Sequence, residues 1–170
     1  MARRGDRCRA AGSARRIEKL SQTYVLDTST LLHLIRGREL GQQIDSAFGL
    51  RTAMYRHTIS IVTHGEMKVL AERNNWGEQK RDALAVALDS LVTINIDSES
   101  LVEAYVRVEK ACRNAPGSER KMGQNDMWIA ATALLCDLPI ITTDDDFNHL
   151  NGRLITVHWV DPTLGKPKAP

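Results

Sequence analysis

Short apolar runs alternate along the chain with longer amphipathic segments. The runs are rich in β-branched residues and predict strands over 24–26, 58–62, 92–96, 139–143 and 154–159. Between them, apolar residues recur every three or four positions and predict helices over 28–35, 39–48, 63–73, 77–91, 98–112 and 125–138. Strands that alternate with helices in this way favour one parallel sheet with helices on both faces.

The stretch 123–147, GQNDMWIAATALLCDLPIITTDDDF, carries the clearest pattern. Its helix begins near Asn125 and Asp126 and must end before Pro139, because proline disfavours the helical conformation in the residue that precedes it. The strand that follows is almost wholly apolar, which is typical of a strand covered on both faces. It ends in three consecutive aspartates, 144–146, so this segment has carboxylates at both ends.

The composition is that of a globular protein. With 170 residues, 42% of them apolar and 26% charged, the chain can bury the core of a single domain, which we place at 22–160. No run of about 18 apolar residues occurs, so the sequence predicts no membrane span. Cys8, Cys112 and Cys136 are an odd number at spacings that fit no zinc motif, and we interpret them as reduced thiols of a cytoplasmic protein.

The charge is unevenly distributed. Residues 1–20 carry seven basic and two acidic side chains, a local charge of +5, which leaves −3 for the other 150 residues because the whole chain carries +2. We predict a disordered basic leader at 1–21 and a flexible tail at 161–170. The leader can be interpreted as an arm that tracks nucleic acid or as a plain extension or targeting segment. Its lack of aromatic residues for base stacking favours the second interpretation.

Four acids occupy equivalent places in the predicted sheet. Asp27 follows the first strand, Glu66 comes soon after the second, Asp126 opens the helix before the fourth, and Asp144 follows the fourth. The carboxyl ends of parallel strands meet at one edge of a sheet, where α/β proteins bind ligands. Each acid can also be interpreted as a helix cap worth about 1 kcal/mol, with Glu66 completing a capping box that begins at Thr63.

The cost of clustering these acids favours a cation site. Two carboxylates about 4 Å apart repel each other by about 4 kcal/mol at an effective dielectric constant near 20, so a cluster must take up protons or bind a cation. With no histidine or cysteine at ligand spacing, carboxylate oxygens and water would be the ligands, which suits Mg²⁺ or Mn²⁺. One or two such ions would support phosphoryl chemistry. The histidines form no ligand pair and no nucleophile arrangement; they are His33, His57, His64, His149 and His158.

Four segments carry a family resemblance: LDTS at 26–29, HGEM at 64–67, QNDMWIAATAL at 124–134 and LPIITTDDDF at 138–147. Together they resemble the PIN-domain ribonucleases, most closely the VapC toxins of bacterial toxin–antitoxin pairs. The similarity runs in the same order from about Tyr24 to Val160. Leu-Asp-Thr alone is a weak signature, whereas the last two segments together are a strong one.

The resemblance implies a fold, an activity and partners. It implies an α/β/α sandwich with a five-stranded parallel sheet, Mg²⁺-dependent endoribonuclease activity, a homodimer, and a small antitoxin protein that packs a helix and tail across the acidic groove. The family's catalytic acids fall on Asp27, Glu66, Asp126 and Asp144. We expect Asp27 and Asp126 to hold the metal, Asp144 to complete the site and Glu66 to position a metal-bound water.

The chain departs from the family pattern at two places. Asp146 matches a further, less regular acid, but Asp145 adds a charge where relatives often have a basic or neutral residue. The resemblance therefore leaves open which of the three consecutive aspartates faces the metal. The basic leader is the second departure.

Basic side chains near the predicted site are candidates for RNA contacts. The first candidates are Arg113, Arg120 and Lys121, with Lys110, Arg36 and Arg38 as further ones. A solvated polar loop explains each of the first three equally well. The helices over 77–91 and 98–112 are apolar enough to cover the sheet and still offer a groove to a partner helix.

Three other functions fit the pattern less well. A phosphatase of the haloacid-dehalogenase type needs a second aspartate two residues after Asp27, where Ser29 stands. A phosphoacceptor receiver domain needs a lysine after its last strand, and 154–159 contains none. A catalytically inactive PIN-like module that binds RNA or acts as a scaffold usually lacks some of the acids, and all four are present here.

Overall fold

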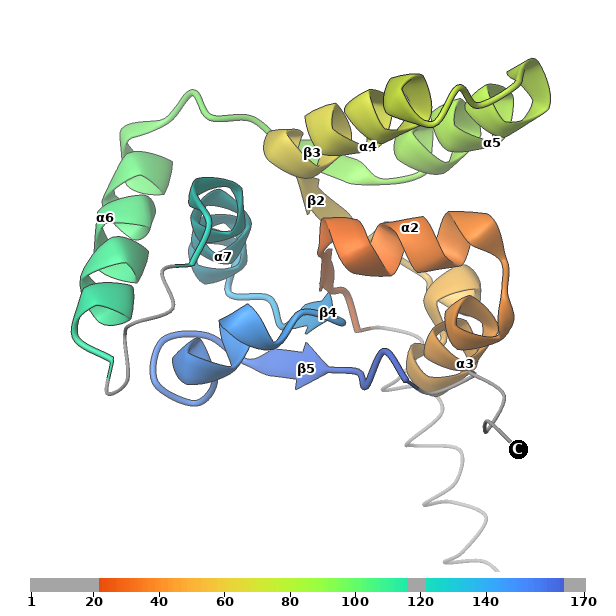
Figure 1. Ribbon diagram of the computed structural model, residues 1–170. Coiled ribbons are helices and arrows are strands. Elements are labelled where there is room, and N and C mark those ends of the chain that lie inside the picture. The colour runs from red at the N-terminus through yellow and green to blue at the C-terminus, as the bar shows by residue number, and fades with distance from the viewer. Residues whose placement is uncertain (1–21, 116–121, 164–170) are drawn as a thin grey trace, which may run out of the picture.

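The computed structural model describes residues 22–115 and 122–163. Its centre is a parallel sheet of five short strands in the order β3-β2-β1-β4-β5 (Figure 1). The strands are β1 (Val25–Leu26), β2 (Thr58–Ser60), β3 (Val92–Ile94), β4 (Ile140–Thr142) and β5 (Val157–Trp159). The predicted five-stranded parallel sheet is thus confirmed. The leader at 1–21 and most of the tail at 161–170 lie outside the described residues.

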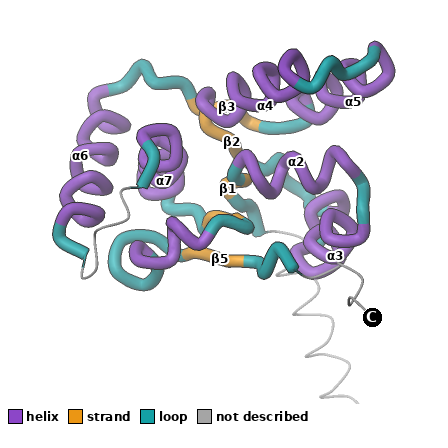
Figure 2. Tube along the Cα trace, in the orientation of Figure 1, coloured by secondary structure: helices purple, strands orange, loops and turns teal. Residues whose placement is uncertain are grey.

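Helices cover both faces of the sheet (Figure 2). The α-helices are α2 (Thr28–Arg36), α3 (Glu39–Phe48), α4 (Ile61–Arg73), α5 (Glu78–Asp89), α6 (Glu99–Arg113) and α7 (Gln124–Cys136). Two short 3-10 helices, η1 (Leu50–Thr52) and η2 (Asp145–Leu150), follow α3 and β4. Among the described residues, no helix combines the length and apolar character that a membrane span requires.

Alternate residues of β1 and β4 enter two separate cores. Val25 and Ile140 pack with the apolar residues of α6 and α7, whereas Leu26 and Ile141 pack with those of α2, α3, α4 and α5. Successive side chains of a strand point to opposite faces, so β1 and β4 each supply both cores. This arrangement is the α/β/α sandwich that the sequence predicts, and it explains why the two central strands β1 and β4 are mainly apolar.

The boundary between β2 and α4 differs from the prediction. The strand predicted over 58–62 ends at Ser60, whose Oγ accepts a hydrogen bond from the Val62 backbone N–H at 3.3 Å and caps α4. Glu66 consequently lies in the second turn of α4 and does not form the capping box with Thr63, which is buried inside the helix. The β-branched residues after Ser60 favour a strand locally, but the cap begins a helix there.

The structure also differs from the prediction at the ends of strands and at one short helix. β3 ends at Ile94 and β5 begins at Val157, so both are shorter than predicted. The helix ends were predicted well, because Gly37 and Gly49 take the left-handed conformation that ends α2 and α3. η2 was not predicted at all.

Arg56 binds the carbonyl groups at the C-terminal end of α5, although it lies more than 30 residues earlier in the sequence. It lies just before β2, and its guanidinium donates hydrogen bonds to the carbonyls of Asp89, Ser90 and Leu91, that of Ser90 at 3.0 Å. The last turn of α5 contains no basic residue of its own. Arg56 therefore satisfies carbonyls that the helix leaves without partners and ties α5 to the sheet.

We expect Arg56→Ala to lower the free energy of unfolding by about 1–2 kcal/mol, because the carbonyls at the end of α5 lose a charged donor. Thermal unfolding would show this as a fall in Tm of about 2–8 °C. Arg107→Ala, which removes an exposed arginine from α6, is the control. Equal melting temperatures for Arg56→Ala and the wild-type protein would mean that water serves these carbonyls as well as Arg56 does.

Candidate active site

The predicted acids gather at the carboxyl edge of the sheet. Asp27 directly follows β1 and Asp144 lies two residues after β4, and these two strands are paired neighbours, with Leu26 opposite Ile141. Glu66 comes from α4, and Asp126 comes from the first turn of α7. The charges of the other acids reach Asp126, as described below. The structure therefore brings the four predicted residues to one place.

Asp27 is the buried member of the group, with 3% of its surface exposed. It caps α2 by accepting hydrogen bonds from the backbone N–H groups of Thr28 and Ser29. Its Oδ2 also accepts the hydroxyls of Ser29 at 2.6 Å and Thr142 at 2.8 Å. Burial raises the pKa of Asp27 above its ordinary value, and these hydrogen bonds oppose the rise.

Thr142 and Ser29 link Asp27 to the segment that carries Asp144. The Thr142 hydroxyl donates to Asp27 and accepts from the Asp144 backbone N–H at 2.9 Å. The Ser29 hydroxyl donates to Asp27 and accepts from the Thr143 backbone N–H at 3.2 Å. Sequence reasoning missed Thr142 altogether. The available signal was a threonine at the end of an otherwise apolar buried strand.

Glu66 is held between two neutral donors. Its Oε2 accepts the hydroxyl of Thr28 at 2.5 Å, and its Oε1 accepts the side-chain amide of Asn125 at 2.6 Å. Both donors stand next to an acid of the site in the sequence, since Thr28 follows Asp27 and Asn125 precedes Asp126. Sequence reasoning treated Asn125 as a helix-start residue and so missed this contact.

Asp126 is the acid on which the other carboxylates of the site act. Its pKa rises from 3.8 to about 7, first because of burial and then because of four neighbouring carboxylates, those of Asp27, Asp144, Glu66 and Asp146. It is not a cap, because α7 has Gly123 as its N-cap residue and no side-chain capping hydrogen bond. A Cβ added at Gly123 would lie 2.8 Å from Asp126 Oδ2, so Gly123 leaves room for this carboxylate.

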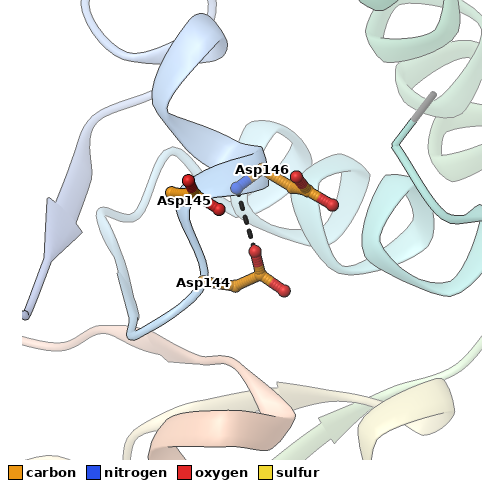
Figure 3. Close-up of side chains that lie close together, drawn as sticks. All are labelled: Asp144, Asp145 and Asp146. Carbon is orange, nitrogen blue, oxygen red and sulfur yellow. Dashed lines mark hydrogen bonds between the residues drawn. The ribbon is translucent and has the colours of Figure 1, made fainter. Parts of the chain in front are cut away.

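The three consecutive aspartates differ in their placement (Figure 3). Asp144 caps η2, with Oδ1 accepting the Asp146 backbone N–H at 2.9 Å. Asp144 and Asp146 are half-buried and both act on the pKa of Asp126, whereas Asp145 is exposed and is not among the causes of that shift. The geometry therefore favours Asp144 and Asp146 as the members of this trio that face the site.

The site fits a hard divalent cation that keeps part of its water shell. Within the described chain, 144–146 is the group whose candidate ligand atoms all lie within 4.8 Å of one another, and no three of the four predicted acids approach so closely. A cation among those four acids would therefore be bound directly by one or two carboxylates, with waters bridging to the rest, as is usual for Mg²⁺. The donors are all oxygens, and the repulsion at Asp126 would be relieved by a positive charge.

The structure describes only some of the basic residues that the sequence suggested as RNA contacts. Arg113 forms an ion pair with Glu109 one turn earlier on α6. Arg120 and Lys121 lie outside the described residues. Arg36, Arg38 and Lys110 are exposed.

Asp126→Asn should stabilise the metal-free protein at neutral and higher pH. The pKa of Asp126 is raised in the folded protein, so its contribution to stability is complete below its ordinary value of 3.8 and is lost as the pH rises through about 7. In EDTA at pH 8, we expect a gain of about 1–2 kcal/mol, kept small by solvent screening, which is a rise in Tm of about 2–8 °C.

Glu78→Gln is the matched control, because Glu78 is an exposed acid in the first turn of α5. It should lower Tm slightly through loss of a favourable interaction with the helix dipole. If Asp126→Asn also lowered Tm at pH 8, the charge of Asp126 would be acting as a helix-start charge and not as a member of a repulsive cluster.

Comparisons with known proteins identify the family of this chain. The family model of the PIN domain matches residues 24–153. Ribonuclease VapC5 of Mycobacterium tuberculosis is 33% identical over 131 residues, which cover 75% of this chain and 87% of that protein. The structure of VapBC2 from Rickettsia felis, bound to a promoter DNA fragment, aligns with a TM-score of 0.64 at 17% identity over 81% of this chain and 98% of that one.

VapBC-5 from Mycobacterium tuberculosis, a member of the VapBC family of toxin–antitoxin systems, aligns with a TM-score of 0.55 at 26% identity, covering 81% of this chain and 97% of that one. The family model spans most of the described domain, and the VapC5 relative covers three quarters of the chain. The chain therefore belongs to the PIN-domain family.

Proposed function

We propose that this protein is a divalent-metal-dependent endoribonuclease that acts as the toxin of a toxin–antitoxin pair. The observation that carries this proposal is the gathering of carboxylates around the half-buried Asp126: burial and then their charges raise the pKa of Asp126 to about 7, and a positive charge would relieve the repulsion. A relative that is 33% identical is a ribonuclease, which supports RNA as the substrate. The acids present at the site support an active enzyme.

Each residue of the site would have its own role in cleavage. Asp27 and Asp126 would hold Mg²⁺ or Mn²⁺, with Asp144 completing the site and Asp146 adding negative charge beside it. When bound, the ion would polarise the phosphodiester and lower the pKa of the attacking water. Glu66, whose two oxygens are fixed by Thr28 and Asn125, would orient that water. Exposed Arg36 and Arg38 would contact RNA phosphates, together with Lys110, Arg113, Arg120 and Lys121.

Cleavage of RNA by the purified chain should require a divalent cation and Asp27. With a panel of transfer RNAs as substrates, we expect cleavage with Mg²⁺ or Mn²⁺, none with excess EDTA, and a loss of at least about 100-fold in Asp27→Asn, because a metal ligand is removed. Asp82→Asn, which neutralises an exposed acid on α5, is the control.

Circular dichroism and Tm would establish that Asp27→Asn is folded, and Glu66→Gln gives a second variant if it is not. Cleavage that survives both EDTA and the Asp27→Asn substitution would reject the metal-dependent mechanism.

An apolar groove offers a docking site for the antitoxin. A cavity of about 620 Å³ lies between α2, α5 and the segment 50–57, and its lining is mainly aliphatic. Large side chains at its rim are exposed, including Met54 at 70%, Tyr55 at 59% and Val86 at 70%. Such a surface is suited to the apolar face of a partner helix. We propose that an antitoxin helix docks here.

The sequence named the helices over 77–91 and 98–112 as able to offer a groove to a partner helix. α5 lines the groove described here, whereas α6 packs on α7 at the opposite face of the sheet. α2 takes its place beside α5. On α6, Val102 and Val106 stand one turn apart and are 40% and 58% exposed, which supports this helix as a contact of the proposed homodimer.

Val86→Glu should weaken antitoxin binding without affecting RNA cleavage, because it places a charge in the apolar groove and changes none of the acids. The probe is the protein encoded by the reading frame immediately upstream, co-expressed with this chain and co-purified. Ala85→Glu puts the same charge on the neighbouring exposed position of α5, outside the groove lining, and should leave the complex intact. Equal recovery of the complex from both variants would place the partner elsewhere.

A further inference from the structure

We propose that Asn125 is a positioning residue, which holds the Glu66 carboxylate in the orientation that RNA cleavage requires. The inference rests on the proposed ribonuclease function. Asn125 Nδ2 donates to Glu66 Oε1 at 2.6 Å, and Thr28 Oγ1 donates to Oε2 at 2.5 Å. The two donors come from α7 and α2, and Glu66 comes from α4, so three elements meet at one carboxylate.

Within the described residues, the side chain of Asn125 does not cap the helix in which it lies. α7 begins at Gln124 with Gly123 as its N-cap residue, and no side chain caps it. The amide of Asn125 instead reaches a residue 59 positions away in the sequence. Asn125 is itself exposed, so the amide could be fully hydrated without this contact. We therefore attribute the contact to the orientation of Glu66 and not to stabilisation of the start of α7.

Glu66 needs such a restraint because of the charges around it. Its carboxylate is one of the charges that, after burial, raise the pKa of Asp126. Repulsion between Glu66 and Asp126 favours orientations in which the Glu66 carboxylate turns away from Asp126. One donor fixes one oxygen but leaves the carboxylate free to rotate about that bond, whereas donors on both oxygens fix its plane.

The chemistry of the donor matters as much as its position. A lysine or arginine at position 125 would also hold Glu66, but its positive charge would compete with a metal ion for the acids. A neutral amide orients the carboxylate and leaves the negative charge of the site intact. Aspartate has nearly the same shape as asparagine but offers no N–H group when ionised, and it would add another negative charge beside Glu66.

Steady-state kinetics of RNA cleavage can test this role. We expect Asn125→Ala to lower kcat about 10- to 100-fold, with KM for RNA changed less than about twofold, because binding of RNA does not depend on the contact. Asn125→Asp should lose at least as much activity. Gln124→Ala is the matched control, since Gln124 is the neighbouring exposed amide on α7 and is not bonded to Glu66 in the structure.

A double-mutant cycle separates positioning of Glu66 from direct contact with RNA. If Asn125 acts through Glu66, Asn125→Ala should change the rate less than about twofold in the Glu66→Ala background. A loss of about tenfold or more that persists there would overturn the proposal in favour of direct RNA contact. If Glu66→Ala has no measurable activity, the KM of Asn125→Ala decides: a KM raised tenfold or more overturns the proposal, and a fall confined to kcat supports it.

A readout that does not depend on activity tests the contact itself. In ¹⁵N-labelled metal-free protein, the side-chain amide resonances of Asn125 should shift in Glu66→Ala and stay unchanged in Glu72→Ala, which alters an exposed acid two turns later on α4. Unchanged Asn125 resonances in Glu66→Ala would overturn the proposal. Wild-type protein that cleaves no RNA with either metal would instead reject the ribonuclease function, and the two failures are therefore distinguishable.

Discussion

The repulsion among carboxylates at one edge of the sheet is the constraint on which the site depends. Bringing two of them to about 4 Å costs about 4 kcal/mol at an effective dielectric constant near 20, and several acids surround Asp126. The chain meets this cost with neutral donors, the hydroxyls of Thr28, Ser29 and Thr142 and the amide of Asn125. Within the described chain, the hydrogen bonds that Asp27 and Glu66 accept come from hydroxyl, amide and backbone N–H groups, none of which carries a charge. These two carboxylates are thus oriented without being neutralised, and their charge stays available for a cation.

The fold and the site use the same hydrogen bonds. Asp27 begins α2 as its cap and is held by Thr142 at the end of β4, so the carboxylate joins a helix to the neighbouring strand. Thr142 also accepts from the Asp144 backbone, which places the next acid. A change at Thr142 would therefore alter the position of two acids together, although Thr142 carries no charge.

The sequence predicted what depends on local patterns and missed what depends on distant contacts. Apolar periodicity located the sheet and its helices, and the place of the acids after strands and at a helix start predicted that they would converge. Ser60 shows one limit of local patterns. Ile61 and Val62 are β-branched and favour a strand, but in the structure Ser60 caps α4 and the helix begins at Ile61. Arg56 and Asn125 show the other, since each acts on residues more than 30 positions away. No local pattern distinguishes such a residue from an ordinary exposed one.

The position of α2 gives a physical reason why a partner in the groove could control the acids. The helix begins beside Asp27, and Leu31, Leu34 and Ile35 on it line the groove. Ile35 is eight residues beyond Asp27, which is about 12 Å at 1.5 Å per residue. An extended chain covers that distance in about four residues. A partner helix seated on α2 therefore needs only a short tail to reach the acids, and a basic side chain on that tail would satisfy the charge that a metal ion otherwise neutralises.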